Sequence, residues 1–158
     1  MKNRYNKMIF FAGATLLVDQ LTKVIVEHTF PEGEVRNVIP GFFSLVHVRN
    51  RGGAFGFLSG LNKDHLTLFF LGISVLALCV IFYLYKKMGA GKPWVAAALA
   101  MIFGGASGNL IDRLRFREVI DFLDFHVGPL HWPAFNVADS AISIGTVILL
   151  YHLVMKKI

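Results

Sequence analysis

One aspartate lies where a membrane protein rarely places a charge. Asp139 is in the first turn of the otherwise apolar run FNVADSAISIGTVILLYHLVM, residues 135–155. A charge within a membrane-spanning helix costs a few kcal/mol, so an ionisable residue there is a candidate functional group. The run contains no lysine or arginine that could neutralise it. The partner of Asp139 must therefore come from another segment.

A second carboxylate close to Asp139 would form a pair that is able to catalyse hydrolysis. Two aspartates that share a proton can hydrolyse a peptide bond, because one activates water while the other protonates or polarises the scissile carbonyl. Asp121 and Asp124 precede the apolar run and are the candidates for this second carboxylate. Their spacing alone does not choose between them.

A serine nucleophile is the other route to hydrolysis. Ser140 or Ser143 could be activated by Lys23, which is four residues after Asp19. That neighbouring carboxylate favours the charged, unreactive form of the lysine. The sequence therefore favours paired carboxylates over a serine and lysine pair.

No metal or cofactor is expected. The chain has no H-E-x-x-H motif, and His126 and His131, five apart in a loop with Gly and Pro, are a poor substitute. Cys79 is the only cysteine, so an intramolecular disulfide and a cysteine-built metal site are excluded. Its position within an apolar run predicts a packing role.

The composition indicates an α-helical integral membrane protein. Of the 158 residues 55% are hydrophobic and only 16% are charged, below the quarter that is usual in soluble domains. Stretches long enough to cross the hydrocarbon core predict four transmembrane helices in a single domain, residues 1–158. These stretches are residues 8–26, 66–85, 94–111 and 137–155.

The distribution of positive charge predicts the orientation. The two ends and the connection between the second and third spans contain basic residues and no acidic ones. The positive-inside rule therefore places both termini in the cytoplasm, and the net charge of +6 requires no nucleic acid partner. The basic residues are Lys2, Arg4, Lys7, Lys86, Lys87, Lys92, Lys156 and Lys157.

The two long loops, residues 27–65 and 112–136, then face outward and are not disordered. The segments GFFSLVHV and EVIDFLDFHV are rich in aromatic and β-branched residues, which predicts short strands against the membrane surface. In the third span, Gly104 and Gly108 are four apart, which favours close helix packing.

Polar residues of three spans are expected in one layer near the outer surface. At 1.5 Å per residue, Asp19 lies roughly 16 Å into the first span, and the other members reach a similar outer depth. Each of these residues also has a possible structural role. Asp19 and Lys23 could form an ion pair that orients the helices, and Arg113 could contact lipid headgroups or pair with Asp112. Asn109 and Asn136 could link helices through hydrogen bonds, and Asn136 could instead be an N-cap. The layer comprises Asp19, Lys23, Asn109, Arg113, Asn136 and Asp139.

Five blocks of sequence together resemble the lipoprotein signal peptidases of bacteria, also called signal peptidase II or prolipoprotein signal peptidases. They are LLVDQLTKVIV, VRNRGGAFGFL, GGASGNLIDRL, VIDFLDF and FNVADSAI, in this order over nearly the whole chain. One departure is Gly53, where the family pattern N-x-G-A-A-F leads us to expect alanine.

The resemblance implies an aspartic endopeptidase of the bacterial inner membrane with its active site toward the extracytoplasmic face. It would cut prolipoproteins before a cysteine that carries diacylglycerol, so its partners would be these substrates and membrane lipids. The family's catalytic pair falls on Asp121 and Asp139. Its substrate-binding or site-supporting residues fall on Asp19, Lys23, Asn50, Asn109, Arg113 and Asn136.

The alternative is a small ion- or proton-coupled transporter, because intramembrane Asp, Lys and Arg also form proton relays. A transporter predicts polar residues along the full depth of the bundle, whereas the inner half of these spans is apolar.

Overall fold

A computed structural model describes residues 2–52 and 63–155 of the chain, with side chains for residues 5–52 and 64–155. Its four long helices are each apolar enough to cross a membrane, which confirms the four predicted spans. Gly53 lies outside the described residues. The helices are α1 (Lys2–Thr29), α2 (Lys63–Met88), α3 (Pro93–Phe116) and α4 (Val137–Val154).

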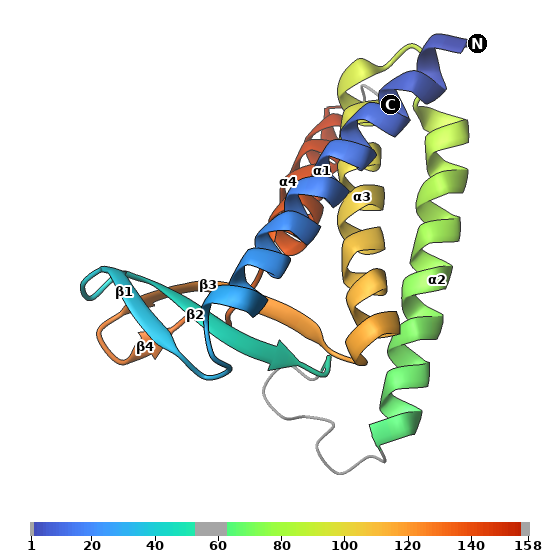
Figure 1. Cartoon of the computed structure of the whole chain (residues 1–158). Coiled ribbons are helices and arrows are strands. Elements are labelled where there is room, and N and C mark those ends of the chain that lie inside the picture. The colour runs from blue at the N-terminus through green and yellow to red at the C-terminus, as the bar shows by residue number, and fades with distance from the viewer. Residues whose placement is uncertain (1, 53–62, 156–158) are drawn as a thin grey trace.

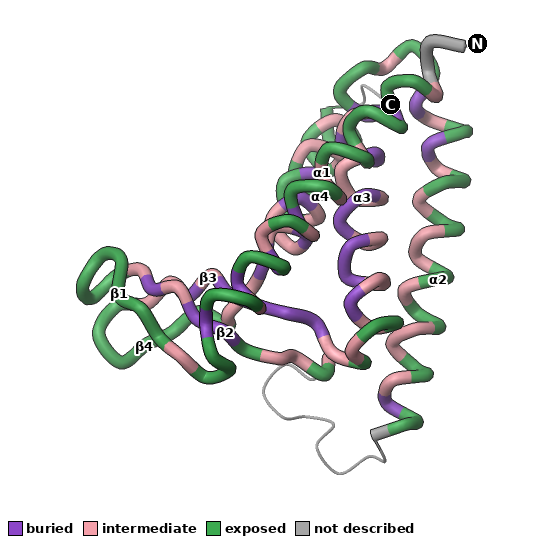
Figure 2. Tube along the Cα trace, in the orientation of Figure 1, coloured by how far each residue is buried: buried purple, intermediate pink, exposed green. Residues whose placement is uncertain are grey.

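The third helix is the centre of the bundle. It packs against α1, α2 and α4, and Figure 2 shows it as the most buried of the helices. Side chains of Met8, Tyr85, Val95 and Leu99 form a core where α1 and α2 meet α3. Because α2 packs mainly against α3, most of its surface is exposed, and Cys79 lies on that exposed surface. The predicted packing role of Cys79 is therefore wrong.

Glycines allow the helices to approach α3 closely. A Cβ atom on Gly104 would lie 2.5 Å from the carbonyl oxygen of Ala12 in α1, and one on Gly108 would collide with the Asp19 carboxylate. A Cβ on Gly105 would lie 2.5 Å from the Ala138 carbonyl of α4. The predicted packing role of Gly104 and Gly108 is confirmed, and the second of them also makes room for a site residue.

A four-stranded antiparallel sheet lies at one end of the bundle, in the order β1-β2-β3-β4. The predicted strands in residues 41–48 and 118–127 are confirmed as β2 (Phe43–Asn50) and β3 (Val119–Val127). Sequence reasoning missed β1 (Val35–Ile39) and β4 (Leu130–His131). All residues of β1 are exposed and β4 is very short, so neither shows a buried alternation.

The loop predicted at residues 112–136 begins too early. Helix α3 continues through Asp112 and Arg113 to Phe116 and ends at Arg117, whose φ of 63° is left-handed and whose N–H bonds back to the Arg113 carbonyl. The extra turn carries charged side chains, so hydropathy alone did not include it. Asp112 and Arg113 are therefore part of the helix and not of the loop.

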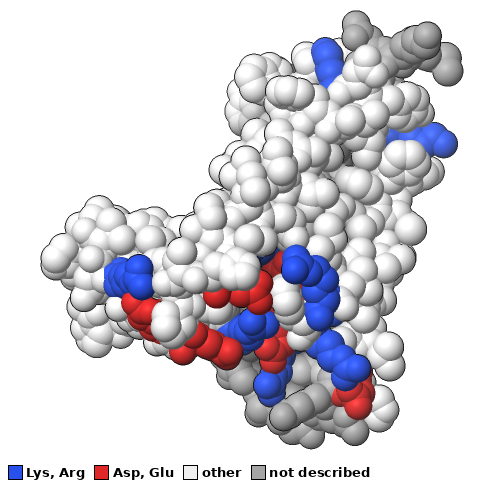
Figure 3. Space-filling model, viewed as in Figure 1, with Lys and Arg blue, Asp and Glu red and all other residues white. Residues whose placement is uncertain are grey.

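The sheet and the chain termini lie at opposite ends of the molecule. Figure 1 shows both termini and the α2–α3 connection at one end of the bundle, with the sheet projecting sideways from the other. In Figure 3 the acidic side chains gather at the sheet end, and the shafts of the helices are uncharged. This arrangement places the polar residues of α1, α3 and α4 beside β2 and β3.

Candidate active site

Asp121 and Asp139 lie on either side of one buried amide. Asn136 Nδ2 donates to Asp121 Oδ1 at 2.7 Å, and Asn136 Oδ1 accepts from the backbone N–H of Asp139 at 2.9 Å. The same Nδ2 lies 3.2 Å from the Ile120 carbonyl and 3.3 Å from Asn109 Oδ1. Asn136 is thus both the N-cap of α4 and a link between elements, the two roles that its position predicted.

The local sequence explains how Asp139 is held. In N-V-A-D the N-cap asparagine and the acid three residues later form a capping box, in which each side chain bonds the other's backbone N–H. Asp139 Oδ2 accepts from Asn136 N at 3.4 Å, and Asp139 Oδ1 accepts from Asn109 Nδ2 at 2.8 Å. Asp139 is partly exposed, so its carboxylate is both oriented and accessible.

Asp121 is more deeply buried, at 2% exposure. Its Oδ2 accepts from Asn50 Nδ2 at 2.9 Å, in addition to the bond from Asn136. Burial is the main reason why the pKa of Asp121 is raised from 3.8 to about 7. The Asn50 hydrogen bond lowers this pKa, and the charge of Asp139 raises it. Two carboxylates with different surroundings are the arrangement from which acid and base roles arise.

Asn50 is oriented by its own loop. Gly52 N donates to Asn50 Oδ1 at 2.8 Å, which leaves Nδ2 directed at Asp121. Gly52 has a φ of +99°, a conformation that a side chain would strain, and a Cβ there would lie 2.5 Å from the Phe70 ring. The glycine after "RNR" is therefore part of what positions Asn50.

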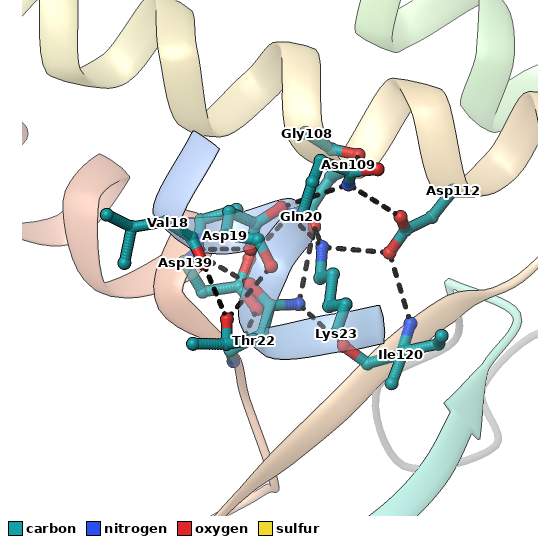
Figure 4. A network of polar contacts seen from close by, with 12 residues as sticks. Val18, Asp19, Gln20, Thr22, Lys23, Gly108, Asn109, Asp112, Ile120 and Asp139 are labelled. Carbon is teal, nitrogen blue, oxygen red and sulfur yellow. Dashed lines mark hydrogen bonds and ion pairs between the residues drawn. The ribbon is translucent and has the colours of Figure 1, made fainter. Parts of the chain in front are cut away.

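Lys23 is the centre of a buried charge cluster, which Figure 4 shows together with Asp139. Its Nζ lies 2.9 Å from Asp19 Oδ2, 2.8 Å from Asp112 Oδ2 and 2.9 Å from Asn109 Oδ1. Asp19 Oδ1 also accepts from the backbone N–H of Ala138 at 2.9 Å. The predicted ion pair is confirmed, and it ties α1 to α3 and to the first turn of α4.

Asp112 is a buried member of this charge cluster that sequence reasoning missed. We expected it at the membrane surface, with Arg113 as a possible partner, but it is 1% exposed and binds Lys23. It also accepts from Gln20 Nε2 at 2.9 Å and from the backbone N–H of Ile120 at 3.3 Å. Asp112 therefore fixes the residue before Asp121. Its spacing of three from Asn109 was the available signal, because residues three apart share a helical face.

Arg113 is not paired with Asp112, whose carboxylate binds Lys23, and its predicted headgroup contact stays a prediction. Its Nη1 donates to the Asn109 carbonyl at 3.3 Å, and its guanidinium lies over the Phe70 ring at 5.6 Å. It is partly buried and interacts electrostatically with Asp139 and Asp121. Arg113 thus places a positive charge between α2 and the two aspartates.

The structure brings Asp121, and not Asp124, to Asn136 at the start of α4. They are three apart on β3, so their side chains leave opposite faces of the strand. Asp124 instead pairs with His131 Nδ1 at 3.0 Å, and the His131 ring stacks on His126. In the part of the chain that the structure describes, no three His, Cys, Asp or Glu side chains are grouped as metal ligands would be.

The serine and lysine alternative does not fit the geometry. Ser140 Oγ donates to the Asn136 carbonyl at 2.9 Å, within its own helix. Lys23 Nζ is fully engaged with two carboxylates and an amide oxygen. A base for serine activation would need a neutral lysine, which two carboxylates disfavour.

Comparison with known proteins identifies similar chains. The family model described as signal peptidase (SPase) II matches residues 11–155. A lipoprotein signal peptidase of Desulforapulum autotrophicum is 48% identical over 90% of this chain and 88% of its own length. One of Syntrophus aciditrophicus is 43% identical over 99% of this chain and 98% of its own.

Two solved structures, each described as a bacterial membrane enzyme, have the same fold as this chain. The first superposes with a TM-score of 0.84 at 33% identity, covering 96% of this chain and 90% of that chain. The second has a TM-score of 0.82 at 34% identity, with 94% and 92% covered.

Proposed function

This chain belongs to the signal peptidase II family of membrane proteases, and we propose that it removes the signal peptides of prolipoproteins by an aspartic mechanism, cutting before a cysteine that carries diacylglycerol. The observation that carries the mechanism is the pair Asp121 and Asp139, joined through Asn136. Family membership and the similar membrane enzymes give no support to the transporter alternative.

In this mechanism Asp121 carries the proton and Asp139 is the base. With a pKa of about 7, Asp121 is protonated through the acidic and near-neutral range. Asp139 takes a proton from water, the water oxygen bonds to the scissile carbonyl carbon, and Asp121 protonates the carbonyl oxygen. The resulting diol then collapses: the C–N bond breaks, Asp139 returns its proton to the amine nitrogen, and Asp121 recovers its proton from a hydroxyl.

The surrounding residues support this chemistry without taking part in bond breaking. Asn50, Asn109 and Asn136 hold the two carboxylates through amide donors. The Lys23 cluster fixes the helices that carry these amides. Arg113, on the α2 side, is placed to orient the substrate.

The location suits a lipid-anchored substrate. The polar layer lies at the sheet end of the bundle, the end away from both termini (Figure 1). We place this end on the extracytoplasmic face of the inner membrane. A diacylglyceryl cysteine would hold the scissile bond at that surface, where water has access.

Incubation of the purified protein with a diacylglyceryl-modified prolipoprotein tests the function. The expected result is a product shortened by its signal peptide, and no such product from the same prolipoprotein without the lipid. An intact lipid-modified substrate after incubation with folded protein would refute the proposal.

The pH dependence of cleavage should change when Asn50 is replaced. Because Asp121 must be protonated, cleavage should fall as the pH rises through about 7. The Asn50 hydrogen bond favours ionised Asp121, so Asn50→Ala should raise the pKa further and move this alkaline limb up by about one pH unit. Its maximal rate should be lower, since Asp121 is less well held.

Rate profiles of the wild type, Asn50→Ala and Asn37→Ala would measure this shift. Asn37 accepts a hydrogen bond from Ser44 in the sheet and is the matched control. The alkaline limb of the Asn37→Ala profile should therefore stay at the wild-type pH. A limb that moves to lower pH in Asn50→Ala would contradict the assignment of the proton to Asp121.

Single cysteines can test the orientation. In a Cys79→Ser background, a cysteine at Glu32, which is 63% exposed beside the sheet, should react with an impermeant thiol reagent on intact cells. A cysteine at Ala90, exposed in the α2–α3 connection, should react only after the cells are opened. The reverse pattern would place the sheet and the candidate site in the cytoplasm.

A further inference from the structure

A cavity of about 350 Å³ lies between the beginning of α2 and the end of α3. Asp64, Thr67 and Leu71 line it from α2, and Arg113 and Arg117 line it from α3. Its volume is at the lower end of the range for small-molecule sites. It can therefore hold a headgroup but not a long chain.

The cavity is positively charged. Arg113 lies in the last turn of α3 and Arg117 is the residue that ends the helix, and the side chains of both line the cavity. Asp64 is the one acidic residue among the described residues that line the cavity, and its 2.8 Å bond to Arg117 joins side chains that are 71% and 72% exposed. Exposed pairs of this kind are weak. Among the described residues, no carboxylate lies within ion-pair distance of Arg113, whose hydrogen bond goes to the Asn109 carbonyl.

The edge of the cavity is apolar and belongs to the membrane-facing surface. Leu68 and Leu114 also line the cavity and are 66% and 65% exposed. They lie on spans, at the end of the bundle where charged side chains gather in Figure 3. The charged part of the cavity is therefore at headgroup depth, with apolar surface directly beside it.

We propose that this cavity binds the phosphate of an anionic glycerophospholipid, whose acyl chains follow Leu68 and Leu114. Guanidinium groups match phosphate oxygens in a bidentate geometry. The exposed leucines favour a lipid over a soluble phosphate, because only a lipid buries them. This site shares Arg113 with the proposed cleavage site, but its test measures lipid binding and not cleavage.

Native mass spectrometry of the full-length protein in detergent, titrated with lipids of matched acyl chains, tests the proposal. Phosphatidylglycerol should bind in preference to phosphatidylcholine, and glycerol 3-phosphate should not bind. Arg117→Gln should weaken phosphatidylglycerol binding about threefold or more, since it removes one guanidinium. Asp64→Asn should strengthen binding, because it removes the competing carboxylate.

Arg115→Gln is the matched control. Arg115 is an exposed arginine of the same turn that stacks over Phe116 and does not line the cavity, so its replacement should leave lipid binding unchanged. An equal loss in Arg115→Gln and Arg117→Gln, with unfolding temperatures like that of the wild type, would show attraction by surface charge alone and overturn the proposal. Equal binding of glycerol 3-phosphate would overturn the lipid as occupant.

Discussion

Asp139→Asn and Asp121→Asn should each lose nearly all cleavage, by a factor of roughly 10³ or more. Asparagine has the shape of aspartate, but it can neither accept the proton of water nor donate one to the carbonyl oxygen. Because the two carboxylates act as one unit, the double variant should be hardly slower than either single variant. Single-turnover cleavage of a diacylglyceryl-modified prolipoprotein would measure these rates.

Asp124→Asn is the control from the same strand. Asp124 leaves the opposite face of β3 and pairs with His131, so its loss should leave most of the activity. If Asp124→Asn were inactive and Asp121→Asn active, the second carboxylate would be wrongly assigned. An active Asp139→Asn would exclude the aspartic mechanism.

Lys23→Ala should cause the largest loss of stability. Lys23 is 2% exposed, and its removal leaves two buried carboxylates, Asp19 and Asp112, without their cation. Breaking a buried pair costs on the order of 3 to 5 kcal/mol, because the remaining charge is uncompensated. Asp112→Asn should cost less, since Lys23 keeps Asp19 as its partner. Thermal unfolding in detergent would measure this order.

Two further variants make this test specific. Lys7→Ala removes an exposed lysine of the same helix and should change stability by less than about 0.5 kcal/mol. Replacing all three charges, with Lys23→Met, Asp19→Asn and Asp112→Asn, should recover part of the stability lost in Lys23→Ala, because no charge then remains unpaired. A Lys23→Ala protein as stable as the wild type would show that the cluster is dispensable.

The spans and two strands of the fold could be predicted from the sequence, because apolar length and aromatic, β-branched runs report directly on burial in lipid or in a sheet. The C-terminal end of α3 could not, since its last turn is charged and hydropathy does not distinguish a charged helix from a loop. This is why Asp112 was expected at the surface and not beside Lys23. Strands β1 and β4 have no buried face that would give a pattern.

The sequence predicted which residues belong to the candidate site better than it predicted the contacts between them. Depth along the helices placed Asp19, Lys23, Asn109 and Asp139 in one layer, and the structure joins them through hydrogen bonds and ion pairs. The choice of Asp121 over Asp124 depended on which face of β3 turns toward α4, and on the bulge that shifts its register with β2. Such registers are set by tertiary pairing and not by composition.

The central claim is that the carboxylate of Asp139, and not a serine beside it, drives the hydrolysis. Single-turnover cleavage by Asp139→Asn and by the double variant Ser140→Ala, Ser143→Ala, on the same lipid-modified prolipoprotein, tests this claim most directly. The serine variant should cleave at nearly the wild-type rate, because Ser140 Oγ donates to the carbonyl of Asn136, the N-cap of its own helix. Asp139→Asn should leave the substrate intact. Cleavage by Asp139→Asn together with an inactive serine variant would contradict the account.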